Sequence, residues 1–443
     1  MRGARALRWV RWLAPGIGVK RWLALAVGGA SLCGAGLTLM ATRPESWIRL
    51  AGLTGVGLGL AASCVGLIQA IRSVLEVMDP VTHGDLVTTV LARRHLQKGL
   101  KIVAIGGGTG LSTLLRGLKA YTMNVTAIVS VADDGGSSGR LRKEFGILPP
   151  GDIRNCLVAL ADAEPLLQQM FQYRFTEGSS LRGHNVGNLL LTALTRLEGD
   201  FEHAIQEASR VLAIRGRVVP STSTKVQLVA KHDDGSLTVG ESKISQAQQP
   251  IRRLWLEPRN SLPTTDALSA IRAADLILVG PGSLFTSLIP NLLVPGIVQA
   301  MLHSAALRVY LCNVMTQFRE THGFTASDHV RALAAHTHPD VVDLCVVNKG
   351  GVPDALLATY RGERAFPVEP DVERIRALGY QVVIDDLISS ENMVRHDPEK
   401  LARAVMRLEW GSRRPPAGRR RLNGHRPNGN GRGVVVGSSR EGA

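Results

Sequence analysis

Two long apolar runs near the start of the chain differ from the rest of the sequence in containing no charged residues. They cover residues 22–41 and 50–70, and neither contains a charged side chain. About 20 apolar residues suffice for a helix to cross the hydrocarbon core of a bilayer. Both runs are rich in Gly, Ala and Ser, which suits close helix packing in lipid. A cleaved signal peptide before a buried helix is the alternative, but the second run and the lack of a small-x-small cleavage site favour a transmembrane hairpin.

Basic residues flank this predicted hairpin unevenly. They are frequent in residues 1–21 and return after residue 71, whereas the connection between the runs has Arg43 and Arg49 opposed by Glu45. Because basic residues stay preferentially on the cytoplasmic side, we expect a multi-pass cell-membrane protein with two spans. Its N-terminus and its main domain are then both cytoplasmic.

The pattern changes at Lys101, where short apolar, β-branched runs begin to alternate with helical stretches. Strands are predicted within residues 101–108, 124–136, 274–283, 307–317, 342–351 and 380–387, and helices within 111–121 and 149–163. Such alternation predicts an α/β fold with a mostly parallel sheet and helices on both faces. In this architecture ligands bind at the carboxyl ends of the strands, which is where each glycine-rich or polar loop of this chain falls.

Three segments depart from this alternation. Residues 224–244 contain two strand-like runs around Asp-Asp-Gly-Ser, which predicts a small β insertion. Residues 71–100 are interpreted as a helical connector between the membrane and the domain of residues 101–410. The tail, 411–443, is rich in Arg, Gly, Pro and Asn and is predicted to be disordered.

Composition excludes some classes of function. Most of the formal net charge of +15 belongs to residues 1–21 and to the tail, so the body is nearly neutral. With 4% aromatic residues and no basic, aromatic patch in the body, nucleic-acid binding is not expected, although the tail arginines leave contact with RNA or anionic lipid open. The five cysteines show no paired spacing, so neither a disulfide framework nor a zinc site is indicated.

The loops at the predicted strand ends carry the candidate chemistry. A glycine-rich turn, Gly106, Gly107, Gly108, Thr109, Gly110 and Ser112, leads from a strand into a helix, where backbone amides favour phosphate; a tight structural turn is the alternative. The next loop holds Asp133 and Asp134, which can bind Mg²⁺, followed by Ser137, Ser138, Arg140 and Arg142, which can bind an anion. An acidic turn with surface arginines remains the simpler interpretation.

Further polar residues follow along the chain. Asp152 is expected to cap a helix, and Arg154 and Asn155 lie in its first turn, where a salt bridge or a ligand phosphate would explain the arginine. His184, Asn185 and Asn188 precede an apolar helix, and a structural histidine is the alternative to a functional one. Two more loops at strand ends contain Gly280, Gly282 and Ser283, and Asn313, Thr316 and Gln317. No serine or cysteine nucleophile has a recognisable local setting, so acyl transfer is disfavoured.

Eight motifs in order resemble the YvcK branch of the CofD-like family. They are AIGGGTGLSTLLRGLK, VADDGGSSGRLR, PPGDIRNCLVALAD, FQYRF, GHNVGNLLL, IRGRVVPST, GPGSLFTSLIPNLLVPGI and NVMTQFRET. The resemblance covers about residues 100–400, and the two apolar runs are similar to those of a membrane-anchored subset. Phe318 and Arg319 stand where the family has Pro-Gly, so we expect that loop to differ in shape. Asn185 stands where the family more often has Ser.

The resemblance implies a Rossmann-like fold and two alternative functions. The YvcK branch binds UDP-sugars such as UDP-N-acetylglucosamine and is linked to gluconeogenic growth, cell shape and cell-wall synthesis. The other branch transfers a phospholactyl group from a nucleotide-activated donor with Mg²⁺. By resemblance, Gly106 to Gly110 line the nucleotide, Asp133 and Asp134 the metal or phosphate, and His184, Asn185 and Asn188 the sugar or donor. We expect a nucleotide-sugar ligand, cell-wall or regulatory partner proteins and a homo-oligomer; whether a reaction is catalysed stays open.

Overall fold

The computed structural model describes residues 19–42, 45–78, 94, 96–349, 351–352, 357, 360, 362, 364–389 and 394–408. The chain divides into two compact units, Met1–Gln97 and Lys98–Ala443. Residues 1–18, most of the predicted connector beyond Met78, and the predicted disordered tail lie outside the described residues.

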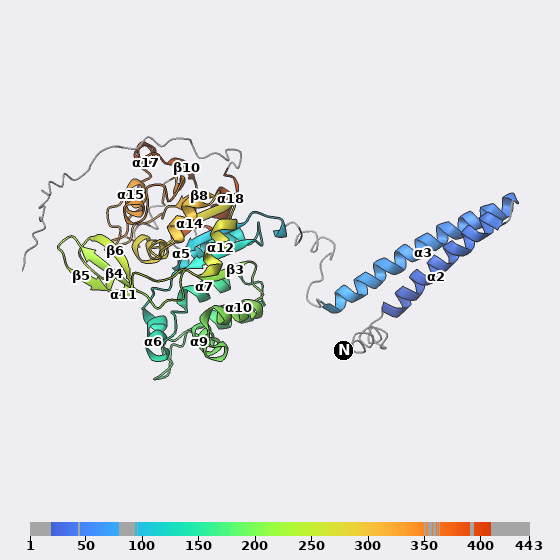
Figure 1. Cartoon of the computed structure of the whole chain (residues 1–443), viewed down its shortest axis with the longest axis horizontal. Coiled ribbons are helices and arrows are strands. Elements are labelled where there is room, and N and C mark those ends of the chain that lie inside the picture. Colours follow the sequence, from blue (N-terminus) through green and yellow to red (C-terminus); the bar gives the residue numbers. More distant parts are fainter. Residues whose placement is uncertain are drawn as a thin grey trace, which may run out of the picture. The chain divides into compact units, whose positions relative to one another are not determined.

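The first unit is a hairpin of two helices, α2 (Val19–Thr42) and α3 (Ser46–Met78), which run side by side in Figure 1. Both are long and apolar enough to cross a membrane, over Lys20–Thr42 and Ser46–Ser73. They approach most closely at glycines: a Cβ added to Gly29 would lie 2.6 Å from the carbonyl oxygen of Gly59. The Ser63 hydroxyl also donates a 3.0 Å hydrogen bond to the Ala26 carbonyl. The two predicted apolar runs therefore form a tightly packed helical hairpin.

The second unit is built on a seven-stranded sheet in the order β10-β9-β8-β7-β1-β2-β3, in which every neighbouring pair is parallel. The strands are β1 (Ile102–Gly106), β2 (Val125–Val129), β3 (Arg217–Pro220), β7 (Leu276–Val279), β8 (Leu307–Leu311), β9 (Leu344–Asn348) and β10 (Gln381–Asp385). This confirms the predicted Rossmann-like α/β core. The edge strand β3 has four residues and was not among the predicted strands.

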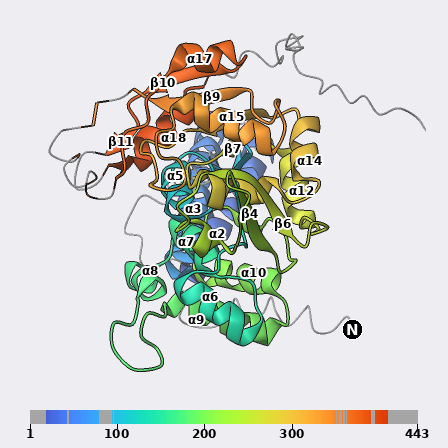
Figure 2. The same cartoon turned by 90° about the vertical axis from the view of Figure 1, so that its left-hand side faces the viewer.

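Helices cover both faces of this sheet. The crossover β1-α5-β2 runs one way across the sheet and β7-α14-β8 the other, and right-handed crossovers in opposite directions place their helices on opposite faces. Figures 1 and 2 show α6 and α9 near one end of the sheet and α17 near the other. The helices between β1 and β3 are α5 (Gly108–Leu118), α6 (Gly136–Phe145), α7 (Gly151–Leu160), α8 (Pro165–Gln172), α9 (Val186–Glu198) and α10 (Phe201–Val211). Those that follow are α12 (Thr265–Ala273), a π-helical turn (Leu284–Leu288), α13 (Ile289–Leu292), α14 (Ile297–His303), α15 (Ala326–His336), α17 (Val372–Ala377) and α18 (Pro398–Met406).

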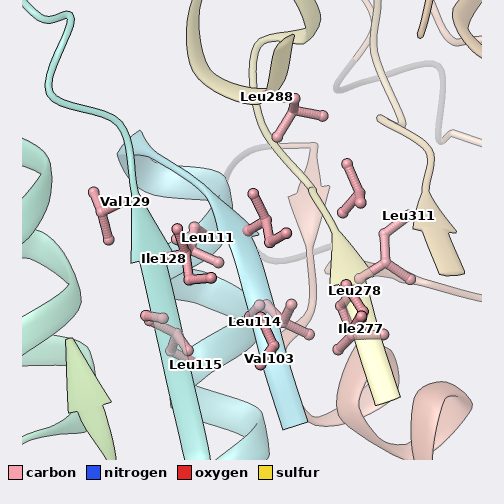
Figure 3. Close-up of a cluster of buried hydrophobic side chains, with 14 of the residues drawn as sticks. Val103, Leu111, Leu114, Leu115, Ile128, Val129, Ile277, Leu278, Leu288 and Leu311 are labelled. Atoms are coloured by element: carbon pink, nitrogen blue, oxygen red, sulfur yellow. The ribbon is translucent and has the colours of Figure 1, made fainter. Parts of the chain in front are cut away.

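The core lies between the sheet and these helices. In Figure 3, Leu111, Leu114 and Leu115 of α5 cluster with Val103 of β1 and Ile128 of β2, and none of the five is more than 2% exposed. Burying a leucine side chain contributes about 2 kcal/mol. The helix that follows the first glycine turn is therefore fixed firmly against the central strands.

The predicted β insertion forms a separate antiparallel sheet in the order β5-β4-β6. β4 (Gln227–His232) and β5 (Leu237–Val239) are the predicted hairpin, and β6 (Ile251–Glu257) adds a third strand that was not predicted. A short helix, α11 (Glu241–Ile244), follows β5. Near the C-terminus, β11 (Ile388–Ser389) and β12 (Arg395–His396) form a small two-stranded sheet before α18.

Candidate functional site

The chain order of the sheet reverses at β1. The chain leaves β1 toward β2 on one side, whereas β7, its other neighbour, leads away to β8. The loops after β1 and β7 therefore diverge at the carboxyl edge and leave a crevice between them, which is the usual ligand position in open α/β sheets.

A cavity of about 480 Å³ lies at this crevice. Its wall comes from the loops after β1, β7 and β8 and from residues near the C-terminus, which include Tyr360, Arg395 and His396. Of the predicted ligand-binding residues, the wall contains Gly107, Gly108, Thr109, Gly110, Gly282, Ser283, Asn313, Thr316 and Gln317. The three loops that the sequence singled out separately thus converge on one cavity.

The glycines of the β1 loop are required by close approaches. A Cβ on Gly110 would lie 2.5 Å from the carbonyl oxygen of Pro281, and one on Gly107 would lie 2.5 Å from Oδ2 of Asp152. Gly108 has φ of +62°, which favours glycine. The loop leads directly into α5, so the positive end of this helix lies at the cavity wall.

Side-chain hydrogen bonds join the β7 and β8 loops. Asn313 donates to the Gly282 carbonyl at 2.8 Å and accepts from the Gly282 amide at 3.1 Å. Gln317 donates to the Ser283 hydroxyl at 2.7 Å, and the Thr316 hydroxyl accepts from the Phe366 amide at 2.9 Å. The polar residues predicted in these loops therefore form one connected wall.

The remaining predicted residues lie outside the cavity lining: Gly106, Ser112, Asp133, Asp134, Ser137, Ser138, Arg140, Arg142, Asp152, Arg154, Asn155, His184, Asn185, Asn188 and Gly280. Gly106 ends β1 and Gly280 directly follows β7, and the Ser112 hydroxyl donates within its own helix to the Thr109 carbonyl. Most of the others gather around the loop after β2, where they form a second polar cluster.

Carboxylates in this second cluster repel one another. Burial, and then the charge of Asp133, raises the pKa of Asp152 to about 7. Burial and the neighbouring acids, Asp133 first, raise the pKa of Glu241 in α11 to about 8. Asp152 also accepts a hydrogen bond from the Gly108 amide, so it joins this cluster to the cavity loop. Such mutual repulsion would be relieved by protons or by a cation.

The expected helix-capping role of Asp152 is wrong. Helix α7 begins at Gly151, Pro150 occupies its N-cap position, and no side chain caps it. Asp152 already lies in the first turn, from which its carboxylate reaches the glycine loop instead.

Asp134 forms hydrogen bonds with the β insertion. Its Oδ1 accepts hydrogen bonds from the Ser242 amide at 2.8 Å and from the Ser242 hydroxyl at 2.6 Å. Asp133 accepts from the Gly135 amide at 2.8 Å. In the described part of the chain, no three His, Cys, Asp or Glu side chains form a complete metal site. A magnesium ion here would rest on Asp133 with Asp152, completed by water or ligand oxygens.

The predicted anion-binding residues have varied partners. Arg140 donates to the Arg182 carbonyl at 3.0 Å, and Arg142 donates to carbonyl oxygens of Val226 and Asp133. Asn185 caps α9 by accepting from the Asn188 amide at 3.2 Å. Nδ1 of His184 lies 3.1 Å from the Ser137 hydroxyl, and burial, then the charge of Arg140, lowers the pKa of His184.

Sequence reasoning missed several residues of both regions. Tyr360, Arg395 and His396 line the cavity but follow no glycine loop, and Glu241 enters the acidic cluster from the insertion. The sequence marks Arg395 and His396 only by their position just before a helix that begins with acidic residues. Such a short pattern is too common to indicate a ligand site. Two buried thiols are poor nucleophiles, because burial raises the pKa of Cys312 to about 12 and that of Cys156 well above its usual value.

Comparisons with known proteins agree with this architecture. Residues 102–388 match the family model described as 2-phospho-L-lactate transferase CofD. The gluconeogenesis factor of Bacillus subtilis is 49% identical over 309 residues, which is 70% of this chain and 98% of that protein. A Nostoc sp. protein is 45% identical over 427 residues, with 92% of this chain and 93% of that protein covered.

A crystal structure of a Bacillus halodurans protein superposes with a TM-score of 0.69 at 48% identity, and it covers 70% of this chain and 100% of that one. The Nostoc match covers more residues than the second unit contains, so it extends into the helical hairpin. The chain therefore belongs to the CofD family, among the relatives named gluconeogenesis factors.

Proposed function

We propose that this protein is a membrane-tethered, cytoplasmic UDP-sugar-binding regulator of gluconeogenic growth, cell shape and cell-wall synthesis, with UDP-N-acetylglucosamine as its ligand. The observation that supports this most is the cavity at the crevice between β1 and β7. Its volume of about 480 Å³ lies in the range of small-molecule sites. A cell-membrane location with both termini cytoplasmic, and cell-wall or regulatory partners, belong to the same proposal.

The chemistry of the wall suits a nucleoside diphosphate. Among the described lining residues, Arg395 is the one arginine or lysine, and a guanidinium can bind a diphosphate through paired hydrogen bonds. The start of α5 supplies backbone amides for the same group. The rings of Phe318 and Tyr360 offer surfaces for a base, and the Asn313 and Gln317 amides offer polar contacts for a sugar.

Calorimetry with UDP-N-acetylglucosamine tests this proposal. Arg395→Met would remove the cation and a charge-assisted hydrogen bond, which is worth about 1.5–3 kcal/mol, so we expect affinity to fall at least about tenfold. Arg407→Met, at the exposed residue that follows α18 and lies outside the lining, is the matched control and is expected to bind normally. Absence of binding to the unsubstituted protein would refute the assignment.

A second candidate is a Mg²⁺-dependent transferase of the 2-phospho-L-lactate transferase type. The acidic residues Asp133, Asp152 and Glu241 favour it, since each has a raised pKa from burial and from like charges that a cation would relieve. A bound Mg²⁺ would stabilise charge on a transferring phosphate. If Asp133→Asn leaves nucleotide-sugar binding intact and no activated donor is turned over by the unsubstituted protein, this candidate fails.

A further inference from the structure

Helix α8 presents a stripe of apolar side chains to solvent. Leu166, Met170 and Tyr173 are four and three residues apart, which places them on one side of the helix and of its C-cap. They are 66%, 48% and 54% exposed, whereas Phe171 is turned into the core and is buried. Single exposed apolar residues are common on protein surfaces, but a contiguous row of them indicates an interaction surface.

The same helix lacks the charged residues that usually cover an exposed helix. Its eight residues, Pro165–Gln172, are either apolar or glutamine. Figure 2 shows α8, and the loop that joins it to α9, at the periphery of the second unit. An exposed helix with an apolar side and no charges is suited to lie against another surface rather than to face water alone.

The loop after α8 continues this surface. Backbone hydrogen bonds close its base: the Phe175 amide donates to the His184 carbonyl at 2.9 Å, and the Gly183 amide donates to the Phe175 carbonyl at 2.7 Å. The rings of Tyr173 and Phe175 meet edge to face, with centroids 5.3 Å apart. Leu181, within the closed loop, is exposed. The loop therefore presents aromatic and aliphatic side chains next to the stripe of α8.

Arginines surround these apolar side chains. Arg174 donates to a carbonyl of the loop at 2.7 Å, and Arg140, from α6, donates to the Arg182 carbonyl at 3.0 Å. Because both acceptors are neutral carbonyl groups, these bonds hold the guanidinium groups in place without cancelling their charge. The acids of the same segment are Glu164 and Glu177, so the three arginines leave a small excess of positive charge.

We propose that α8 and the loop that follows it dock onto the surface of an anionic lipid bilayer, with Leu166, Met170 and Tyr173 inserted among the headgroups. The same chain carries two helices long and apolar enough to cross a bilayer, and their covalent link to this unit raises the effective concentration of lipid around it. Leucine and aromatic side chains beside arginines are typical of helices that lie in the headgroup region. The proposal rests on the membrane location in the proposed function, but not on its nucleotide-sugar ligand.

Sedimentation with lipid vesicles tests this contact on residues 98–410, which lack the hairpin and the arginine-rich tail. The solved Bacillus halodurans relative aligns over its whole length with 70% of this chain, about the share that these residues make up, so a fragment of this extent folds by itself. We expect the fragment to sediment with vesicles of phosphatidylcholine and phosphatidylglycerol, and less with phosphatidylcholine alone, because the arginines attract anionic lipid.

The double variant Leu166→Gln/Met170→Gln is expected to need at least about tenfold more lipid for the same sedimentation, because two apolar side chains no longer insert. Leu262→Gln, at an exposed leucine before α12, is the matched control and is expected to bind like the unsubstituted fragment. Equal urea midpoints are expected for all three fragments, since the substituted side chains are exposed. If the double variant does not fold, Leu166→Gln alone serves instead, with a smaller loss of binding.

The proposal is overturned if the unsubstituted fragment does not sediment with anionic vesicles, or if the α8 variant and the control bind equally. Light scattering without lipid tests a second copy of the chain as the occupant. A dimer that the α8 variant converts into monomers would assign the surface to that second copy, and this result also overturns the proposal. Failure of UDP-N-acetylglucosamine to bind in calorimetry would refute only the ligand of the proposed function.

Discussion

Acid is expected to destabilise the second unit, Lys98–Ala443, through one buried histidine of the cavity wall. His396 is 8% exposed, and burial lowers its pKa to about 4. Among the described residues, neither ring nitrogen of His396 has a hydrogen-bond partner. The folded protein therefore holds this imidazole neutral at a pH where an unfolded chain would protonate it.

The magnitude follows from the two pKa values. An unfolded histidine titrates near 6.5, so between about pH 6.5 and 4 the unfolded chain binds more protons than the folded one. The stability that depends on neutral His396 is complete above pH 6.5 and is lost as the pH falls toward 4. Linkage gives a loss of about 2 kcal/mol between pH 7.5 and pH 5.

Urea unfolding of the unit Lys98–Ala443 provides the assay. The solved Bacillus halodurans relative aligns over its whole chain with 70% of this one, so an equivalent fragment folds without the hairpin. The free energy of unfolding is compared between the unsubstituted fragment and His396→Phe, which keeps a ring in the space. The pH-dependent contributions of titratable groups that both proteins share cancel in the difference between the two free energies of unfolding.

We expect the difference in unfolding free energy to shift by about 2 kcal/mol in favour of His396→Phe when the pH falls from 7.5 to 5. His303→Phe, at an exposed histidine, is the control and is expected to keep the acid sensitivity of the unsubstituted fragment. A difference that is the same at both pH values would refute the argument, since it would mean that the folded state protonates His396 as readily as the unfolded one.

Three further substitutions test close approaches and strain. Gly110→Ala gains about 1 kcal/mol of helix propensity, but its Cβ would lie 2.5 Å from the Pro281 carbonyl oxygen in the β7 loop, which costs about 1–3 kcal/mol. We therefore expect a lower free energy of unfolding in urea and weaker nucleotide-sugar binding by calorimetry. Unchanged values would contradict this geometry. Gly29→Val is expected to widen spin-label distances across the hairpin, because Gly59 lies 2.6 Å from the new Cβ, whereas Gly28→Val meets nothing within 4 Å; equal effects would argue against this packing. Ala213→Gly relieves φ of +46° and is expected to raise stability in urea by about 1 kcal/mol; a decrease would show that Ala213 is not strained.

The central strands were predictable because each is an apolar run that ends in a glycine or polar loop. Both faces of a parallel sheet are largely buried, so β1, β2, β7, β8 and β9 are short and mostly apolar segments. Edge strand β3 ends in Pro220 and has four residues, which are too few to show the alternation of apolar and polar positions that identifies a strand. The third insertion strand, β6, carries exposed charges, and its pairing with β4 depends on a contact distant in sequence.

The part of the cavity wall that the strand-end loops form was predictable for a similar reason, whereas the C-terminal part was not. Loops at the carboxyl ends of β1, β7 and β8 must meet at one edge, whatever the details of packing. Arg395 and His396 reach the cavity only because the C-terminal segment returns to α5. There α18 packs so closely that a Cβ on Gly117 would overlap the Pro398 carbonyl oxygen. No local pattern encodes that return.

Some polar residues predicted to bind a ligand satisfy the protein instead. Asp134 holds the insertion through Ser242, and Asn185 caps α9. Loops that are tightly folded have backbone donors and acceptors of their own, which short polar side chains satisfy. Residue type and position at a strand end therefore predict polarity correctly, but they do not separate a ligand contact from a structural one.

The loop at Phe318 and Arg319, where the resemblance led us to expect Pro-Gly in relatives, combines an unusual backbone with side-chain contacts. Arg319 has φ of +74°, the left-handed backbone that glycine adopts at little cost and that costs other residues about 1–2 kcal/mol. Its Nη1 donates to the Gln246 carbonyl at 2.7 Å, and its guanidinium lies 5.3 Å from the Phe318 ring, contacts that glycine cannot make and that offset the strain. Arg364, with φ of +53°, lies 5.1 Å from the same ring. Because Phe318 lines the cavity and both arginines lie outside the lining, the side chains at this loop fix an aromatic ring at the wall while the backbone keeps a glycine-like conformation. A difference in ligand preference from the relatives is therefore expected to originate at this ring.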